Sequence, residues 1–157
     1  MKYEPKRYQQ LALAFMSKHD RCALFLDMGL GKTVVTLTRI VDLQLHHKIH
    51  KTLVIAPKRV AEDTWTREVR KWDHTRHLRV SLVLGSAAER KRALEKEADL
   101  YVINRDNVTW LVDMIGPDWP FDMVVIDELS SFKSTQAKRW RSLKKVIRMS
   151  EYVVGLT

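Results

Sequence analysis

A short segment of the chain combines the residue types that bind nucleotide phosphates. Residues 26–33 read Leu-Asp-Met-Gly-Leu-Gly-Lys-Thr and lie between an apolar run and an amphipathic one. The backbone can turn tightly at Gly29 and Gly31, so that its N–H groups face phosphate oxygens. Lys32 would then reach the β- and γ-phosphates, and the Thr33 hydroxyl would ligate Mg²⁺, as in a Walker A loop. The segment begins with leucine where the complete pattern has its first glycine, which leaves a simple glycine-rich turn as the alternative.

Two adjacent carboxylates follow a second apolar run. Residues 123–126 are Met-Val-Val-Ile, and Asp127 and Glu128 come directly after them. Asp127 would hold Mg²⁺ through water, and Glu128 would orient and polarise an attacking water molecule. By itself, an Asp-Glu pair after a strand is also typical of a helix cap or a solvated turn. Because both segments follow strands expected in one sheet, they can meet around one metal ion, and together they indicate nucleotide binding.

The elements that position these residues alternate along the chain between short apolar runs and longer amphipathic segments. Such alternation predicts an α/β fold with a central, mostly parallel sheet covered by helices on both faces. The predicted strands are residues 22–26, 52–55, 80–84, 100–103, 123–126 and 152–156. The predicted helices are residues 6–18, 32–46, 61–72, 87–97, 105–114 and 135–148. Ligands of such sheets bind beyond the carboxyl ends of the strands, where both chemical segments lie.

The composition indicates one folded domain with a polyanionic partner. The chain has 157 residues, of which 45% are apolar, and its 28 Lys and Arg against 19 Asp and Glu give a net charge of +9. This excess favours nucleic acid as the partner, although a merely soluble basic protein would show the same count. One cysteine excludes an internal disulfide. The sequence shows neither a signal peptide nor an apolar run that could span a bilayer, so we expect an intracellular, cytoplasmic protein with no membrane contact. Its setting would be a nucleoid or a phage-infected cell.

The positive charge is concentrated near the end of the chain. Residues 129–150 contain seven cations and no acid. In the predicted helix 135–148, the spacing puts four cations on one face, namely Lys138, Arg141, Lys145 and Arg148. The opposite face is apolar and holds Trp140, Leu143, Val146 and Ile147. This basic stripe predicts a contact with a phosphate backbone or with another lobe of the protein, and an ordinary solvated face is the alternative.

The motifs and their order resemble the Swi/Snf-type ATPases of helicase superfamily two. Residues 27–33 are similar to motif I of that family, and Asp127 with the three residues after it is similar to motif II. Further similarities cover the glutamine motif, motif Ia, motif Ib and motif III, at residues 8–9, 53–57, 102–106 and 153–157. The resemblance implies a three-layer RecA-like P-loop domain that uses ATP and Mg²⁺. The short lobe without insertions is typical of a compact bacterial or phage form.

The resemblance also implies a role for individual residues. ATP would be bound by Gln9, Gly29, Leu30, Gly31, Lys32 and Thr33, with Gln9 at the adenine edge. Lys32, Asp127 and Glu128 would be catalytic, and Thr33 and Asp127 would hold Mg²⁺. The nucleic-acid contacts would be Lys58, Asn104 and Arg105, beside Lys138, Arg141 and Lys145 of the basic stripe. Such contacts bind the backbone rather than read the bases. Duplex DNA is the preferred track, and RNA is the alternative.

The chain departs from the family pattern in two ways. Ser130 stands where motif II usually ends in histidine, a residue that couples ATP to nucleic acid in the family. The sequence also stops within motif III, so we expect residues 1–157 to be the first RecA-like lobe, without the second. Because the second lobe supplies an arginine finger, we expect the chain alone to hydrolyse ATP poorly.

Two other functions remain as alternatives to a translocase or helicase-like motor. One is a nucleic-acid-binding module of the same fold that does not hydrolyse ATP. The presence of Lys32, Thr33, Asp127 and Glu128 argues against it, because each has a separate role in hydrolysis. The other is a small P-loop kinase, which would need an acceptor site and an arginine-bearing lid and would have no use for Gln9.

Overall fold

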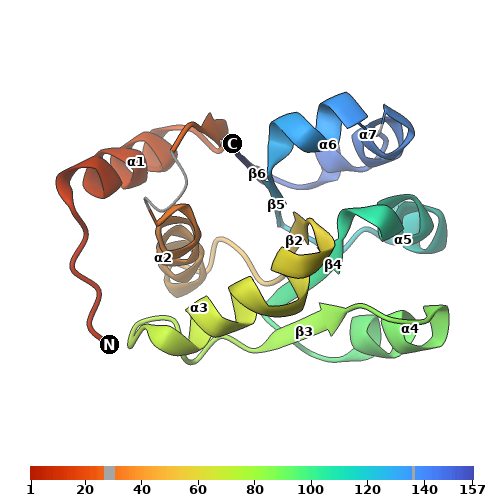
Figure 1. The fold of residues 1–157 in the computed structure, drawn as a ribbon, viewed down its shortest axis with the longest axis horizontal. Helices are drawn as coiled ribbons and strands as arrows, with labels where there is room; N and C mark the ends of the chain where they lie inside the picture. Colours follow the sequence, from red (N-terminus) through yellow and green to blue (C-terminus); the bar gives the residue numbers. More distant parts are fainter. Residues whose placement is uncertain (27–30, 136) are drawn as a thin grey trace.

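The centre of the protein is a sheet of six parallel strands. The computed structural model describes residues 1–26, 31–135 and 137–157 (Figure 1). The strands are β1 (Arg21–Leu24), β2 (Thr52–Ala56), β3 (Val80–Val83), β4 (Leu100–Asn104), β5 (Met123–Asp127) and β6 (Tyr152–Leu156). Their order in the sheet is β1-β6-β5-β2-β4-β3, and every pair is parallel. All six predicted strands are confirmed, with ends that differ by no more than two residues.

Helices cover both faces of this sheet and make a three-layer structure (Figure 1). They are α1 (Arg7–Lys18), α2 (Lys32–Leu45), α3 (Trp65–Lys71), α4 (Ala87–Glu95), α5 (Val108–Ile115), α6 (Leu129–Thr135) and α7 (Ala137–Lys144). A π-helical turn, Val60–Thr64, precedes α3, and three short 3₁₀ helices are Arg105–Asn107, Gly116–Asp118 and Ile147–Met149. Figure 1 shows α1, α2 and α3 on one side of the sheet and α5, α6 and α7 on the other. The predicted α/β architecture, a parallel sheet with helices on both faces, is confirmed.

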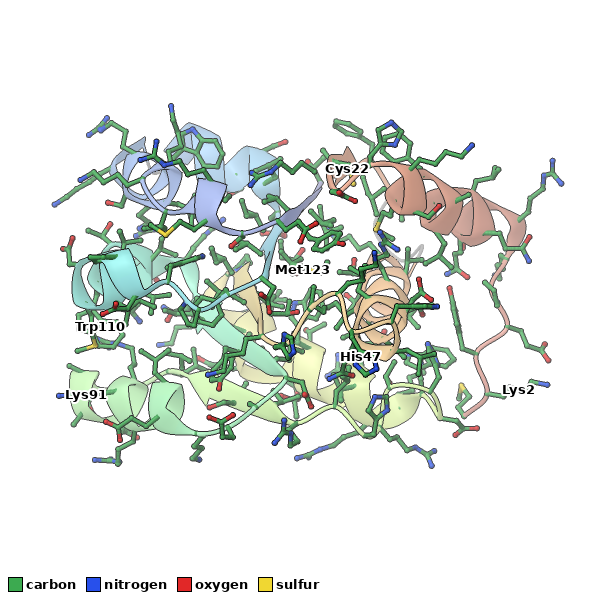
Figure 2. The ribbon with its side chains drawn as sticks, turned by 180° about the vertical axis from the view of Figure 1, so that it is seen from behind. Lys2, Cys22, His47, Lys91, Trp110 and Met123 are labelled. Atoms are coloured by element: carbon green, nitrogen blue, oxygen red, sulfur yellow. The ribbon has the colours of Figure 1, made fainter. Side chains whose placement is uncertain are left out.

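Two hydrophobic cores lie between these layers because successive strand residues point to opposite faces. On β2, Val54 packs into the core under α1, α2 and α3, whereas its neighbour Leu53 packs into the core under α5, α6 and α7. Val125 and Val124 of β5 divide between the two cores in the same way. Met123, at the start of β5, lies in the middle of the molecule in Figure 2. Strands buried on both faces explain why the sequence shows continuous apolar runs instead of alternation.

The basic helix predicted at residues 135–148 is shorter in the structure. Helix α7 ends at Lys144, and the chain then tightens into 3₁₀-type turns, with the Lys145 N–H donating to the Ser142 carbonyl at 3.2 Å. These turns bury both Leu143 and Val146. Helix α6, directly before α7, is not among the predicted helices. The four cations of the stripe remain exposed, but two of them lie beyond the end of α7.

We expect Phe132→Ala to lower the free energy of unfolding by about 3–5 kcal/mol, the usual cost of emptying a buried phenylalanine site. Phe132 is fully buried and packs edge-on against Trp140, with ring centroids 6.1 Å apart. Urea unfolding followed by tryptophan fluorescence measures the loss. The matched control is Phe25→Ala, because Phe25 is 80% exposed and should change stability by less than about 0.5 kcal/mol. Similar losses in the two variants would contradict the observed packing of α6.

Candidate nucleotide-binding site

The candidate site lies where the two chemical segments meet at the carboxyl edge of the sheet. Lys32 is the first residue of α2, and Asp127 is the last residue of β5. The Lys32 ammonium lies 3.7 Å from Asp127 Oδ1. From the start of α3, the indole N–H of Trp65 donates a hydrogen bond of 3.1 Å to the other oxygen, Oδ2. The structure thus places the predicted lysine next to the carboxylate of the predicted aspartate.

This carboxylate is costly to bury. The side chain of Asp127 is 4% exposed. Burial raises the pKa of the Asp127 carboxyl above its usual range, although the nearby Lys32 charge and the Trp65 hydrogen bond act to lower it. Among the residues that the structure describes, Asp127 Oδ1 has no hydrogen-bond donor. An acceptor oxygen held this way next to a lysine has the chemistry to ligate a hydrated cation.

Glu128 follows Asp127 in an unusual backbone conformation. Its φ angle is +58°, in the left-handed region that residues other than glycine rarely adopt. The Glu128 carbonyl accepts from the Phe132 N–H at 3.0 Å and so begins α6. Its side chain is half-buried and lines a cavity together with Lys32. Strained residues of this kind cluster at functional sites, because surrounding contacts must hold them in place.

On the other side of Lys32, the start of α2 lies against α1. Gly31 has a φ angle of +74°, and a Cβ atom there would lie 2.5 Å from Gln9 Nε2. Position 31 therefore favours glycine for its left-handed conformation, and a side chain there would also displace the Gln9 amide. Thr33 is buried in the first turn of α2. The predicted residues Gly29 and Leu30, with their neighbours Asp27 and Met28, lie outside the described residues.

Lys32 lines two cavities. One, of about 700 Å³, also contains Gln9, Gly31 and Thr33 and is bounded by the N-terminal segment and by α3. The other, of about 660 Å³, contains Glu128, and the remaining lining residues are Phe25, Leu26, Ser130, Ser131 and Thr157. Lys32 thus stands between a cavity on the side of Gln9 and a cavity on the side of Glu128.

Two serines at the start of α6 connect the second cavity to neighbouring elements. The Ser130 and Thr157 hydroxyls are 2.7 Å apart, which links α6 to the residue after β6. Ser131 accepts a hydrogen bond of 2.8 Å from the Arg105 guanidinium, which follows β4. The family resemblance places a histidine at position 130, and here the smaller serine contacts the motif III threonine instead.

The predicted nucleic-acid contacts lie in two groups. Lys58 is exposed after β2, and Arg105 follows the neighbouring strand β4. Asn104 is buried, and its Oδ1 accepts from Asn107 at 2.6 Å, so it shapes the turn after β4. The second group is exposed on and after α7, and it consists of Lys138, Arg141 and Lys145. An ion pair of 2.5 Å between Arg139 and Asp106 joins α7 to the turn after β4.

Sequence analysis missed three residues of this site: Trp65, Tyr3 and Ser131. Trp65 falls on the apolar face of an amphipathic segment, which predicts burial but not the acceptor that its N–H meets. Tyr3 donates to Gln9 Oε1 at 3.1 Å from a segment that carries no motif.

No helix in the described ranges is long and apolar enough to cross a membrane.

Comparison with known proteins identifies relatives over nearly the whole chain. The model of the SNF2-related domain matches residues 8–154. Putative protein p41 of Acyrthosiphon pisum secondary endosymbiont phage 1 is 38% identical over 154 residues, which cover 94% of this chain and 34% of p41. The chromatin remodeling factor mit1 of Schizosaccharomyces pombe is 28% identical over 159 residues, which cover 93% of this chain and 11% of mit1. The chain therefore spans about a third of the length of p41 and about a tenth of the length of mit1.

A solved structure shares the fold. The Sulfolobus solfataricus SWI2/SNF2 ATPase core in complex with dsDNA superposes with a TM-score of 0.82 at 24% identity. The match covers 100% of this chain and 32% of that one.

We expect Asp127→Asn to raise the melting temperature of the protein by a few degrees at neutral pH. In the native chain an ionised carboxylate is buried, and its pKa is raised despite the Lys32 charge. Ionised Asp127 lowers the stability of the folded protein at pH values above its raised pKa. This loss of stability vanishes below the pKa of an ordinary aspartate, so the gain in melting temperature from Asp127→Asn should shrink toward about pH 4. Asparagine keeps an acceptor for Trp65.

Circular-dichroism melting curves at neutral and acidic pH measure this difference. The control Asp113→Asn removes an exposed carboxylate of α5 and should leave the melting temperature unchanged. A lower melting temperature of Asp127→Asn at neutral pH would show that the ion pair with Lys32 outweighs the cost of burial.

Proposed function

Since the chain belongs to the family of SNF2-related domains, we propose that residues 1–157 form the first, ATP-binding RecA-like lobe of a motor that moves along nucleic acid. The contact between Lys32 and Asp127 at the carboxyl edge of the sheet carries this proposal. Because the chain spans about a third of p41, ATP hydrolysis and movement are proposed for a whole motor that contains this lobe.

The residues at the site suit a nucleotide and its magnesium ion. Oδ1 of Asp127 is buried without a hydrogen-bond donor among the described residues, so it would accept from a water molecule of a hydrated Mg²⁺. Thr33 and Asp127 would hold the metal, and Lys32 would hold phosphate oxygens. Mg²⁺ bound there would neutralise phosphate charge during hydrolysis.

The other residues of the site divide the remaining tasks. Gln9 would contact the base in the cavity on its side of Lys32, which is large enough for a nucleoside. Glu128 would accept a hydrogen bond from a water molecule in the other cavity and orient it toward the terminal phosphate.

Duplex DNA is the proposed track. A solved relative of the same fold binds dsDNA, and the chain has a net charge of +9 that is concentrated after β5. The proposed contacts are Lys58 and Arg105 at the carboxyl edge, together with Lys138, Arg141 and Lys145. They would bind phosphates without reading sequence, so affinity should depend on salt. If the chain binds RNA more tightly than DNA in the same titration, RNA is the track and the proposal of DNA is wrong.

We expect Lys32→Ala to weaken binding of ATP–Mg²⁺ by about tenfold to a hundredfold, because it removes a charge-assisted contact to phosphate. Isothermal titration calorimetry measures the affinity. The control Lys18→Ala removes an exposed lysine at the end of α1 and should bind ATP as the native chain does. Equal affinities for all three chains would contradict the nucleotide site. DNA binding by a folded chain that binds no ATP would favour the module that does not hydrolyse nucleotide.

We expect the double substitution Lys138→Ala with Arg141→Ala to weaken duplex DNA binding about equally for all sequences. Each lost phosphate contact should also make the slope of log affinity against log salt shallower by about one. Fluorescence anisotropy over a range of salt concentrations measures both effects.

The control for this titration is Lys91→Ala with Arg92→Ala, which removes the same charge from α4. Lys91 lies at the periphery of the molecule (Figure 2). An equal change of slope in the two double variants would show that net charge alone, and not the α7 surface, determines binding.

A further inference from the structure

The N-terminal segment, residues 1–6, forms a wall of the cavity that contains Gln9. It runs from α1 past α2 to the end of α3 (Figure 1). Met1, Lys2, Tyr3, Glu4 and Lys6 all line this cavity. The terminal ammonium donates to Asp73 Oδ1 at 2.7 Å and to the Lys71 carbonyl at 3.0 Å. The segment is therefore attached at both ends and holds its side chains against the cavity.

Tyr3 is held within this wall by aromatic neighbours. Its ring lies edge-on to Trp72 and parallel to His74, and the centroid distance is 5.3 Å in both cases. His74 in turn contacts the Thr38 hydroxyl of α2 at 2.8 Å. Burial, together with the neighbouring Tyr8, raises the pKa of the Tyr3 phenol, so the phenol stays protonated and can donate. These contacts hold the ring of Tyr3, and with it the hydroxyl, against α2 and α3.

That hydroxyl contributes to the orientation of the Gln9 amide. Gln9 Oε1 accepts from the Tyr3 hydroxyl at 3.1 Å and from the Lys6 N–H at 2.9 Å. The Nε2 end of the same amide faces Gly31. An amide turned by 180° would put its NH₂ group against the Lys6 N–H, and it would exchange the bond that Tyr3 donates for one that the phenol accepts. Among the described residues, the Tyr3 hydroxyl is the side-chain donor to Oε1 and can be removed by substitution, whereas the Lys6 N–H belongs to the backbone.

We propose that Tyr3 is a positioning residue that fixes the amide of Gln9 and thereby sets the selectivity of the cavity for adenine over guanine nucleotides. The inference rests on the proposed function, in which Gln9 contacts the base. Adenine presents an amino donor beside its N7 acceptor, whereas guanine presents a carbonyl acceptor beside N7. A side-chain amide can distinguish these two edges only while its oxygen and nitrogen keep their places.

The test is the ratio of the affinities for ATP–Mg²⁺ and GTP–Mg²⁺, measured by calorimetry for the native chain and for Tyr3→Phe. Phenylalanine keeps the ring and its packing on Trp72 and His74 and removes only the hydroxyl. We expect the preference for ATP to fall by about fivefold, the effect of one hydrogen bond. A purely structural role would weaken both nucleotides by the same factor and leave the ratio unchanged, which would overturn the proposal.

Two further variants make the result specific. In a Gln9→Ala background, Tyr3→Phe should have no further effect on the ratio, because the residue through which it acts is gone. A further effect in that background would overturn the proposal. The control Tyr152→Phe removes a phenol hydroxyl at the start of β6, on the amino edge of the sheet, and should keep the native ratio of affinities.

Lys32→Ala separates this inference from the proposed function. If Lys32→Ala weakens both nucleotides while Tyr3→Phe leaves the ratio unchanged, the nucleotide site stands and the role of Tyr3 fails. If Lys32→Ala has no effect on either nucleotide, the proposed function fails. A native chain that binds ATP and GTP equally would also overturn the role of Tyr3.

Discussion

The buried carboxylate of Asp127 is the interaction on which the arrangement of the site depends. A parallel sheet brings the carboxyl ends of its strands to one edge, so β5 delivers Asp127 beside the start of α2. Removing a carboxylate from water is unfavourable without partners, and here Lys32 and Trp65 act on its two oxygens. Residues 32, 65 and 127 thus come from three helices or strands far apart in the chain. Any displacement of α2, α3 or β5 would leave a buried charge less well compensated.

Most of the fold could be predicted from the sequence because it rests on local patterns. Strands buried on both faces require continuous apolar runs, and each of the six runs is a strand. Helix α6 shows where this reasoning ends. Its residues Leu-Ser-Ser-Phe-Lys-Ser-Thr include several weak helix formers, so propensity does not predict it. The burial of Phe132 stabilises this helix. The left-handed Glu128 turns the chain out of β5 directly before it.

The candidate site follows the same division between local pattern and long-range contact. Lys32 and Asp127 could be predicted because their chemistry requires a fixed spacing from a glycine turn and from a strand end. Spacing does not reveal that the Gln9 amide, from a separate helix, lies close to Gly31. Trp65 and Tyr3 act through single polar atoms, and hydrophobic patterning does not report where such atoms point. Their partners are 62 and 6 residues away, so only the packed structure brings them together.

The turn after β4 connects the cavity lined by Glu128 to α7, which carries part of the basic stripe. Arg105 donates to Ser131, which lines the cavity of Glu128, and Asp106 pairs with Arg139 on α7. Asn104 and Asn107 hold the turn itself together. Both outward contacts are made by side chains, and the Asp106 side chain is 55% exposed. These contacts can therefore change partners without breaking a strand pair, and a polyanion on α7 would compete with Asp106 for Arg139. Energetic coupling between two sites requires an element with two discrete arrangements that both sites favour differently. In the structure, the turn after β4 contacts α6 through Arg105 and α7 through Asp106, and these contacts define one such arrangement.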